Sequence, residues 1–338
     1  AGDESLRPRG WAGMLWSPAI GAEHAGTREA AGLFDESSFA KLDISGPGAA
    51  AFLESLCANH VARGVGQITY TQMLNRRGGI ECDFTVTRLG DQEFRIVTGT
   101  AFGNHDLGWL RTHLPGDGSV RVTDVTSQYS CFGLWGPKAR DILAPLTPAD
   151  LSNAAFPYMT TRELTVGGVP IRALRVTYVG ELGWELYCPS EFGATLWSAL
   201  WEAGQPHGLV AAGYKAIDTL RLEKGYLVWG ADITPDETPD EAGLGFAVKV
   251  DKPGGFIGRQ ALVEARERGP RVKLACLTLE DPRSVALGNE PVRIGGEISG
   301  RVTTGGYGFT IGKSIAFAYL PPEHAAPGTE VAVEIFGE

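Results

Sequence analysis

The chain has 338 residues, of which 43% are hydrophobic and 21% are charged, as is typical of a globular protein. Its formal net charge is −10, and no basic patch interrupts the acidic excess, so the sequence argues against nucleic acid as a partner. No apolar run approaches the roughly 18 residues that a membrane span needs, so we expect no membrane association.

The five cysteines lie far apart and form no C-x-x-C pair. This spacing predicts free thiols in a reducing compartment and not a disulfide framework. We therefore expect a cytoplasmic protein.

The first third of the chain predicts short strands around one helix. Residues 41–46 alternate between apolar and polar side chains, as in a strand, and apolar side chains at helical spacing follow over 47–60. The stretches 68–75 and 80–90, separated by the turn "RRGG", predict a hairpin. Residues 93–99 predict its third strand.

Longer elements alternate with strands in the rest of the chain. The stretch 120–136 returns to a strand pattern. The run "RVTYVGELGWELYCP", residues 175–189, flanks Gly180 to Gly183 with two alternating segments, which predicts a strand, a bend and a second strand. Helices are predicted over 104–114, 191–204 and 213–225.

The C-terminal part differs in pattern from the part before it. From about residue 244 the sequence shows short strands and turns, with little helix. The chain is therefore expected to be an α+β protein whose last ~90 residues form a separate all-β module.

Sequence motifs for nucleotides and metals are incomplete. "GLGFAV" at 243–248 lacks the third glycine of a dinucleotide fingerprint. "GFTIGKS" at 308–314 has Tyr307 where a phosphate loop needs glycine, so a β-turn is expected there. The six histidines do not cluster, and no Cys/His spacing suits zinc, so we expect no metal site.

Isolated polar residues within apolar strands are the remaining candidates for chemistry. Alternation places Asp83 on the face of its strand opposite Cys82 and Phe84, where it could simply face solvent. Tyr70 on the partner strand could be an ordinary cross-strand aromatic. Glu185 lies between Trp184 and Leu186, a position that β-propensity disfavours for a carboxylate.

The ordinary explanation for Glu185 is a salt bridge. An arginine such as Arg221, on a predicted helix, could supply the positive charge. The pattern alone leaves the functional and the structural explanations open for Tyr70, Asp83 and Glu185.

Three long segments carry a family resemblance. "IGAEHAGTREAAGLFDESSFAKLDISGPGA", "YVGELGWELY" and "AIDTLRLEKGYLVWGADITPDETPDEAGLGFAVK" resemble the glycine-cleavage T-protein (aminomethyltransferase) family. The similarity is closer to the folate-binding region of dimethylglycine and sarcosine dehydrogenases and oxidases. It extends over residues 17–338.

The resemblance implies a three-domain cloverleaf around a central hole that holds tetrahydrofolate. The implied domains are 1–50 plus 130–240, a discontinuous α+β folate-binding domain, then 51–129, a second α+β domain. Residues 241–338 are the implied C-terminal, barrel-like all-β domain.

The resemblance also implies roles for individual residues. Asp83 matches the family's catalytic aspartate near N5 and N10 of the folate, and Tyr70 matches its pterin-facing tyrosine. Glu185 matches the carboxylate that pairs with the pterin's amino group and ring N–H, a bidentate arrangement. Tyr178 lines the same pocket. Arg221 matches an arginine near the folate, although only one arginine of the family's "ARDSLRLE" stretch is present in "YKAIDTLRLE".

The implied activity is tetrahydrofolate-dependent one-carbon transfer. The leading hypothesis is capture of a methylamine-derived carbon as 5,10-methylenetetrahydrofolate, with a flavin oxidoreductase domain or chain as partner. One alternative is a demethylase that moves an intact methyl group from a small N-, O- or S-methyl donor and gives 5-methyltetrahydrofolate. Another is a non-catalytic folate-binding module, whose K-G-C-Y-x-G-Q-E signature is absent.

Overall fold

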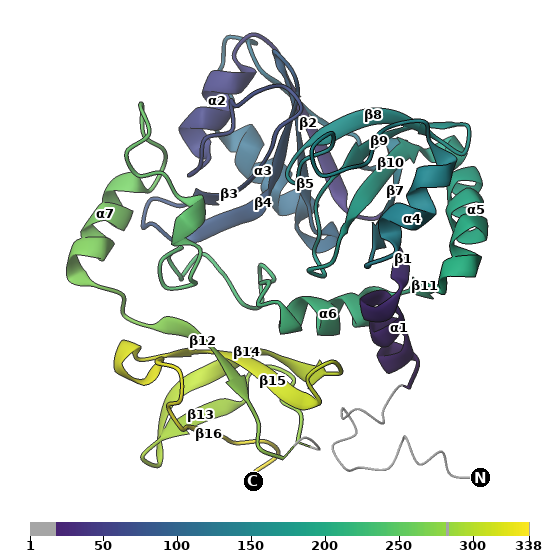
Figure 1. The fold of residues 1–338 in the computed structure, drawn as a ribbon. Coiled ribbons are helices and arrows are strands. Elements are labelled where there is room, and N and C mark those ends of the chain that lie inside the picture. The colour runs from purple at the N-terminus through teal and green to yellow at the C-terminus, as the bar shows by residue number, and fades with distance from the viewer. Residues whose placement is uncertain (1–17, 282–283, 338) are drawn as a thin grey trace.

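The computed structural model describes residues 18–281 and 284–337, and within these the strands form three sheets, each the centre of one lobe (Figure 1). Helices lie beside the first two sheets, whereas the third, C-terminal sheet is entirely antiparallel. The predicted α+β class, with a C-terminal all-β module, is confirmed. No helix of the described segments is long and apolar enough to cross a membrane.

The first sheet has the strand order β11-β1-β7-β10-β9-β8. The β1–β11 pair is parallel and the other pairs are antiparallel. The helices α4 (Ala139–Leu143) and α5 (Gly193–Gly204) pack against one face of this sheet, through a core that includes Trp184 and Leu186. The strands are Ala31–Asp35 (β1), Tyr129–Trp135 (β7), Thr161–Val166 (β8), Val169–Leu174 (β9), Gly183–Pro189 (β10) and Leu209–Ala212 (β11).

The second sheet has the order β3-β4-β5-β2-β6 and is antiparallel. The helices α2 (Ala49–Leu56) and α3 (Gly103–Thr112) bury apolar side chains against one face, together with Cys82 and Phe84 of β4. The strands are Ala40–Ser45 (β2), Ile68–Leu74 (β3), Ile80–Gly90 (β4), Glu93–Thr98 (β5) and Arg121–Asp124 (β6).

The third sheet has the order β12-β15-β14-β13-β16. The helices α1 (Pro18–Glu29) and α6 (Tyr214–Glu223) lie between the first and the third sheets (Figure 1), and Leu222 packs against Ile315 and Phe317. The strands are Lys273–Thr278 (β12), Pro291–Ile294 (β13), Glu297–Gly308 (β14), Lys313–Leu320 (β15) and Ala332–Val333 (β16).

Most of the strands predicted by alternation are present, but two predictions are wrong. The stretch 120–136 is not one strand, because a 3₁₀ turn at Thr126–Gln128 divides it into β6 and β7, which lie in different sheets. Residues 175–179 are not a strand either. Here the Thr177 hydroxyl accepts hydrogen bonds from the backbone N–H groups of Val179 and Gly180, so these groups do not pair with a neighbouring strand.

A helix in the C-terminal part is a further difference. The helix α7 (Arg259–Arg268) precedes the third sheet, although little helix was expected beyond residue 244. Leu262 is its one fully buried side chain, so it lacks the apolar stripe that reveals a helix in sequence. The predicted β-turn in "GFTIGKS" is confirmed, since residues 309–312 join β14 to β15.

The predicted domain boundaries stay a prediction. The strands of the second and third sheets can be compared with the boundaries predicted at residues 51 and 241. The strand β2 lies in the second sheet, although it precedes residue 51. The third sheet begins at Lys273, after α7.

All five cysteines are free thiols, as predicted, and only Cys276 is exposed.

Candidate active site

Two of the five predicted site residues contact the segment 226–256, since Tyr70 stacks on Phe246 and Tyr178 stacks on Tyr226. Tyr70 and Asp83 come from the second sheet, Glu185 from the first, and Tyr178 from the loop before β10. A backbone hydrogen bond of 2.9 Å from Ile68 N–H to the carbonyl oxygen of Met159 connects the second sheet to the loop before β8. The site is therefore built from separate parts of the fold.

Asp83 is partly buried and hydrogen-bonded, and is not a plain solvent-facing residue. Gln72 Nε2 donates a hydrogen bond of 2.7 Å to Asp83 Oδ1. Burial raises the pKa of Asp83 to about 6, while hydrogen bonds from Tyr70 and Gln72 lower it and nearby Asp106 raises it. With this pKa, the carboxyl group can both hold and release a proton near neutral pH.

Tyr70 is the aromatic partner of Asp83. Burial raises the pKa of Tyr70 well above its usual value, and the negative charge of Asp83 adds to this, so its phenol stays protonated and can donate to the carboxylate. Its ring stacks on that of Phe246, at 6.2 Å between centroids, and it packs against the apolar cluster below the segment 226–256. Tyr70 therefore interacts with Asp83 and Phe246 in addition to its cross-strand neighbours.

Glu185 lies on the face of the first sheet that is turned away from α4 and α5. As expected from alternation, Trp184 and Leu186 belong to the helix-covered core, while Tyr187 shares the opposite face with Glu185. The Tyr187 hydroxyl donates a hydrogen bond of 2.5 Å to Glu185 Oε2. Burial raises the pKa of Glu185, whereas this hydrogen bond and Lys41 lower it.

A second carboxyl group, Glu36, lies next to Glu185. Gly133 is the cross-strand neighbour of Glu185, and a Cβ atom on Gly133 would lie 3.0 Å from Glu36 Oε2. Glu36 is 0% exposed, and neither of its carboxyl oxygens has a hydrogen-bond partner among the described residues. Burial and the charge of Glu185 raise its pKa well above the usual value, while Lys41 lowers it.

Tyr178 is influenced by the charge of Asp83, and Tyr158 by that of Glu185. Tyr178 stacks on Tyr226, with ring centroids 5.9 Å apart, and its hydroxyl donates a hydrogen bond of 2.7 Å to the carbonyl oxygen of Leu227. Burial raises the pKa of Tyr178, the charge of Arg221 lowers it, and the charge of Asp83 raises it further. Partial burial raises the pKa of Tyr158, and nearby Tyr226 and Glu185 raise it further.

Arg221 is held in a buried ion pair and lies near Tyr178, whose pKa it lowers against the effect of burial. Its Nη1 donates hydrogen bonds to Asp232 Oδ2 at 2.8 Å and to the carbonyl oxygen of Tyr226 at 3.0 Å, and both side chains of this ion pair are buried. Asp232 Oδ1 also accepts a hydrogen bond from Thr303 of β14. Arg221 therefore does not pair with Glu185, and it connects α6 to the third sheet.

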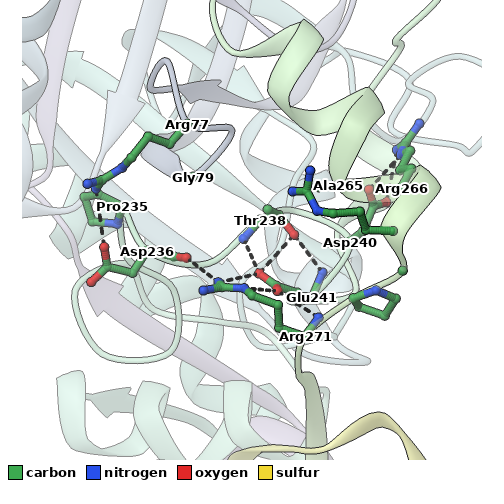
Figure 2. A pocket seen from close by; sticks show the side chains of 13 residues that line it. Arg77, Gly79, Pro235, Asp236, Thr238, Asp240, Glu241, Ala265, Arg266 and Arg271 are labelled. Atoms are coloured by element: carbon green, nitrogen blue, oxygen red, sulfur yellow. Dashed lines mark hydrogen bonds and ion pairs between the residues drawn. The ribbon is translucent and has the colours of Figure 1, made fainter.

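A polar cavity of about 660 Å³ lies apart from these residues, between the β3–β4 turn, the loop 235–241 and the end of α7 (Figure 2). None of the five predicted site residues lines it. Two of its arginines are held by strong pairs, Arg271 with the buried Glu241 and Arg266 with Asp240. The predicted site residues lie outside this cavity.

Sequence reasoning missed Glu36 and the tyrosines at 158 and 226. Glu36 follows the apolar strand β1 directly, but its burial depends on β7 and β10, which are distant in sequence. Tyr226 lies within a segment that carries the family resemblance. Tyr158 lies in a loop with no periodic pattern.

The three-sheet fold is that of aminomethyltransferases. The glycine cleavage system aminomethyltransferase T from Bartonella henselae superimposes with a TM-score of 0.85 at 30% identity, covering 94% of this chain and 86% of that chain. The family model for the GCVT N-terminal domain matches residues 5–252, and that for the glycine cleavage T-protein C-terminal barrel domain matches 273–338. The chain belongs to the glycine cleavage T-protein family.

The chain is similar to relatives of about its own length and to much longer relatives. An aminomethyltransferase of Symbiobacterium thermophilum is 38% identical over 97% of this chain and 88% of its own length. The mitochondrial dimethylglycine dehydrogenase of Rattus norvegicus is 37% identical over 96% of this chain, but over 38% of its own length. The chain thus spans a little over a third of the length of the dehydrogenase relatives. The cytoplasmic compartment stays a prediction.

Proposed function

We propose that the protein is a tetrahydrofolate-dependent one-carbon transferase that captures a methylamine-derived carbon as 5,10-methylenetetrahydrofolate. Family membership supports a folate-related one-carbon reaction. Similarity to dimethylglycine dehydrogenase, sarcosine dehydrogenase and 4-methylaminobutanoate oxidase supports a methylated amine as the carbon source. The observation that carries the proposal is the buried Asp83 carboxyl group held by Gln72 and Tyr70, together with the buried carboxyl group of Glu185 on the first sheet.

The residues present fit a reduced pterin. Glu185 is a buried carboxylate on a rigid strand, so it can accept hydrogen bonds from an adjacent ring N–H and amino group. The stacked rings of Tyr178 and Tyr226 supply flat apolar surface for a planar heterocycle. Tyr187 holds the Glu185 carboxylate in place through its short hydrogen bond.

Asp83 is the proposed proton-handling group. Tetrahydrofolate supplies the two nitrogens that carry the carbon, and Asp83 would orient one of them and accept its proton. A carboxyl group with a pKa of about 6 is mostly ionised at pH 7, yet is basic enough to take up a proton. Gln72 and Tyr70 fix its position, so little reorganisation is needed.

The electron balance of the reaction calls for a partner. Converting an N-methyl carbon to the methylene level removes two electrons, which the chain's own side chains do not accept. We infer that a flavin oxidoreductase domain or chain takes these electrons, consistent with the much greater length of the dehydrogenase relatives. In the methyl-transfer alternative an intact methyl group moves, and no oxidant is required.

Product analysis tests the proposal. The protein is mixed with tetrahydrofolate, dimethylglycine and an amine-oxidising flavoprotein, and the folates are identified by mass spectrometry. We expect faster formation of 5,10-methylenetetrahydrofolate than without the protein, and no acceleration by Asp83→Asn. Formation of 5-methyltetrahydrofolate without the flavoprotein would instead support methyl transfer. Folate binding without either product would support the non-catalytic module.

A further inference from the structure

A thiol, an imidazole and a carboxyl group come together between β4 and α3. Cys82 lies on β4, on the face opposite Asp83, and His105 and Asp106 are consecutive residues of α3. One potential ligand atom from each of these three side chains lies within 4.8 Å of the other two. Cys82 and Asp106 are buried, whereas His105 is partly exposed and gives solvent access to the group.

Asp106 has an unusual environment for a buried carboxyl group. The residue is 2% exposed, and its Oδ2 atom is buried without a hydrogen-bond partner among the described residues. The Thr98 hydroxyl and the Cys82 thiol lie near enough to lower its pKa, although burial raises it overall. A buried oxygen without a well-formed hydrogen bond calls for an explanation, and a bound ion is one.

The ring of His105 is held between two carboxylates. Its Nε2 lies 3.2 Å from Glu81 Oε1, and its Nδ1 lies 3.1 Å from Asp106 Oδ1. Trp229 packs against the ring, with centroids 4.9 Å apart. If Nε2 carries the proton and donates it to Glu81, the lone pair of Nδ1 faces Asp106. A carboxylate that orients a histidine in this way is common behind metal ligands.

We propose that Cys82, His105 and Asp106 bind one Zn²⁺ ion, with Glu81 positioning the imidazole and water in the fourth place. Zinc prefers this mixture of thiolate, imidazole and carboxylate ligands, and three protein ligands leave a position open. In tetrahedral geometry with bonds of about 2.0–2.2 Å, the nitrogen and oxygen ligands lie about 3.3 Å apart. The 3.1 Å between His105 Nδ1 and Asp106 Oδ1 is close to this value.

Binding has a defined proton balance. The Cys82 thiol loses its proton to solvent and the sulfur forms the metal bond, so affinity rises with pH. The thiol must approach the two other ligands by up to roughly 1 Å to reach bonding distance. The ion would connect β4 to the beginning of α3 and, through His105, to the loop that carries Trp229.

Cobalt substitution tests the site without reference to folate. The protein is freed of metal with a chelator and titrated with Co²⁺, and the thiolate-to-cobalt absorption is recorded. We expect one Co²⁺ per chain with a thiolate charge-transfer band, and displacement of Co²⁺ by Zn²⁺. Cys82→Ser should abolish the band, whereas Cys276→Ser, which removes the exposed thiol of β12, should leave it unchanged.

Two milder variants keep the test decisive if Cys82→Ser does not fold. His105→Gln alters a partly exposed side chain and should weaken Co²⁺ binding at least tenfold. Glu81→Gln should keep the band and weaken binding roughly tenfold, as is typical of groups that orient a metal ligand. Binding without a charge-transfer band, or no stoichiometric uptake, would overturn the proposal and leave His105 as a ring that is hydrogen-bonded to two carboxyl groups.

Discussion

The carboxyl groups of Glu36 and Glu185 lie beside each other across Gly133, with Glu36 fully buried. A Cβ atom at residue 133 would lie 3.0 Å from Glu36 Oε2 and closer still to the ring of Trp135. Two carboxylates in an apolar environment cannot both stay ionised at little cost. Lys41 offsets part of the repulsion, but its Nζ already donates hydrogen bonds to the carbonyl oxygens of Ser37 and Phe39. Burial and the charge of Glu185 therefore raise the pKa of Glu36 well above its usual value.

The first prediction concerns stability and pH. The folded pKa of Glu36 is raised above its unfolded value of about 4.3, so between these two values only the folded state binds the proton. Stability consequently falls as the pH rises through this window, by up to about 1.4 kcal/mol per pH unit. Glu36→Gln should flatten this slope in urea unfolding between pH 5 and 8.

The exposed Glu29 provides the control for this measurement. Glu29→Gln should keep the wild-type slope, because its carboxyl group remains in water in both states. Identical slopes for wild type and Glu36→Gln would show that Glu36 is ionised in the folded protein, against this account.

The second prediction concerns catalysis by Asp83. With a pKa of about 6, its carboxylate form increases as the pH rises through 6, so the wild-type kcat/KM should rise there and level off above. Asp83→Asn should lower kcat by about 100-fold or more and remove this pH dependence, because the amide cannot accept the proton. Binding of tetrahydrofolate should change by less than about threefold.

A neighbouring residue controls for local disturbance of β4. Thr85 lies on the same face of the strand, and Thr85→Ala should keep near wild-type turnover. Near wild-type activity of Asp83→Asn would make Asp83 a structural residue and refute the proposed proton transfer.

The third prediction concerns Arg221, whose match to a folate-binding arginine stays untested. Its ion pair with Asp232 is fully buried, and removing one partner leaves the other charge uncompensated. Arg221→Ala should therefore lower the free energy of unfolding by about 3–5 kcal/mol. Chemical denaturation measures this, with the exposed Lys215→Ala on the same helix as a control that should change stability by at most about 0.5 kcal/mol.

The opposite pattern would change the assignment of Arg221. If Arg221→Ala keeps its stability but loses tetrahydrofolate binding, the arginine contacts the folate and its ion pair contributes little.

Alternation of apolar and polar residues predicted the strands that have one core-facing side and one side of different character. Alternation separated Trp184 and Leu186 from Glu185 and Tyr187, and the structure confirms this division. It failed over 175–179, where side-chain hydrogen bonds to the backbone decide the conformation. It also missed α7, because that helix buries little apolar surface and its pattern is mostly charged.

The surroundings of the site residues depend on contacts that are distant in sequence. The burial of Glu36 results from the order β1-β7-β10, and the approach of Cys82 to His105 from the packing of α3 on the second sheet. No short motif contains either arrangement. The family resemblance supplied the roles of Asp83 and Glu185, whereas the partner of Arg221 emerged only from the fold.

Calorimetric titration with tetrahydrofolate, for wild type and Glu185→Ala, tests the central claim most directly. We predict micromolar binding by the wild type and a loss of about 1–3 kcal/mol in the variant, because the pterin donors lose their acceptor. Glu163→Ala, which changes an exposed glutamate of the same sheet, should bind as the wild type does. Equal affinity of wild type and Glu185→Ala, or no binding by the wild type, would contradict the proposed pocket.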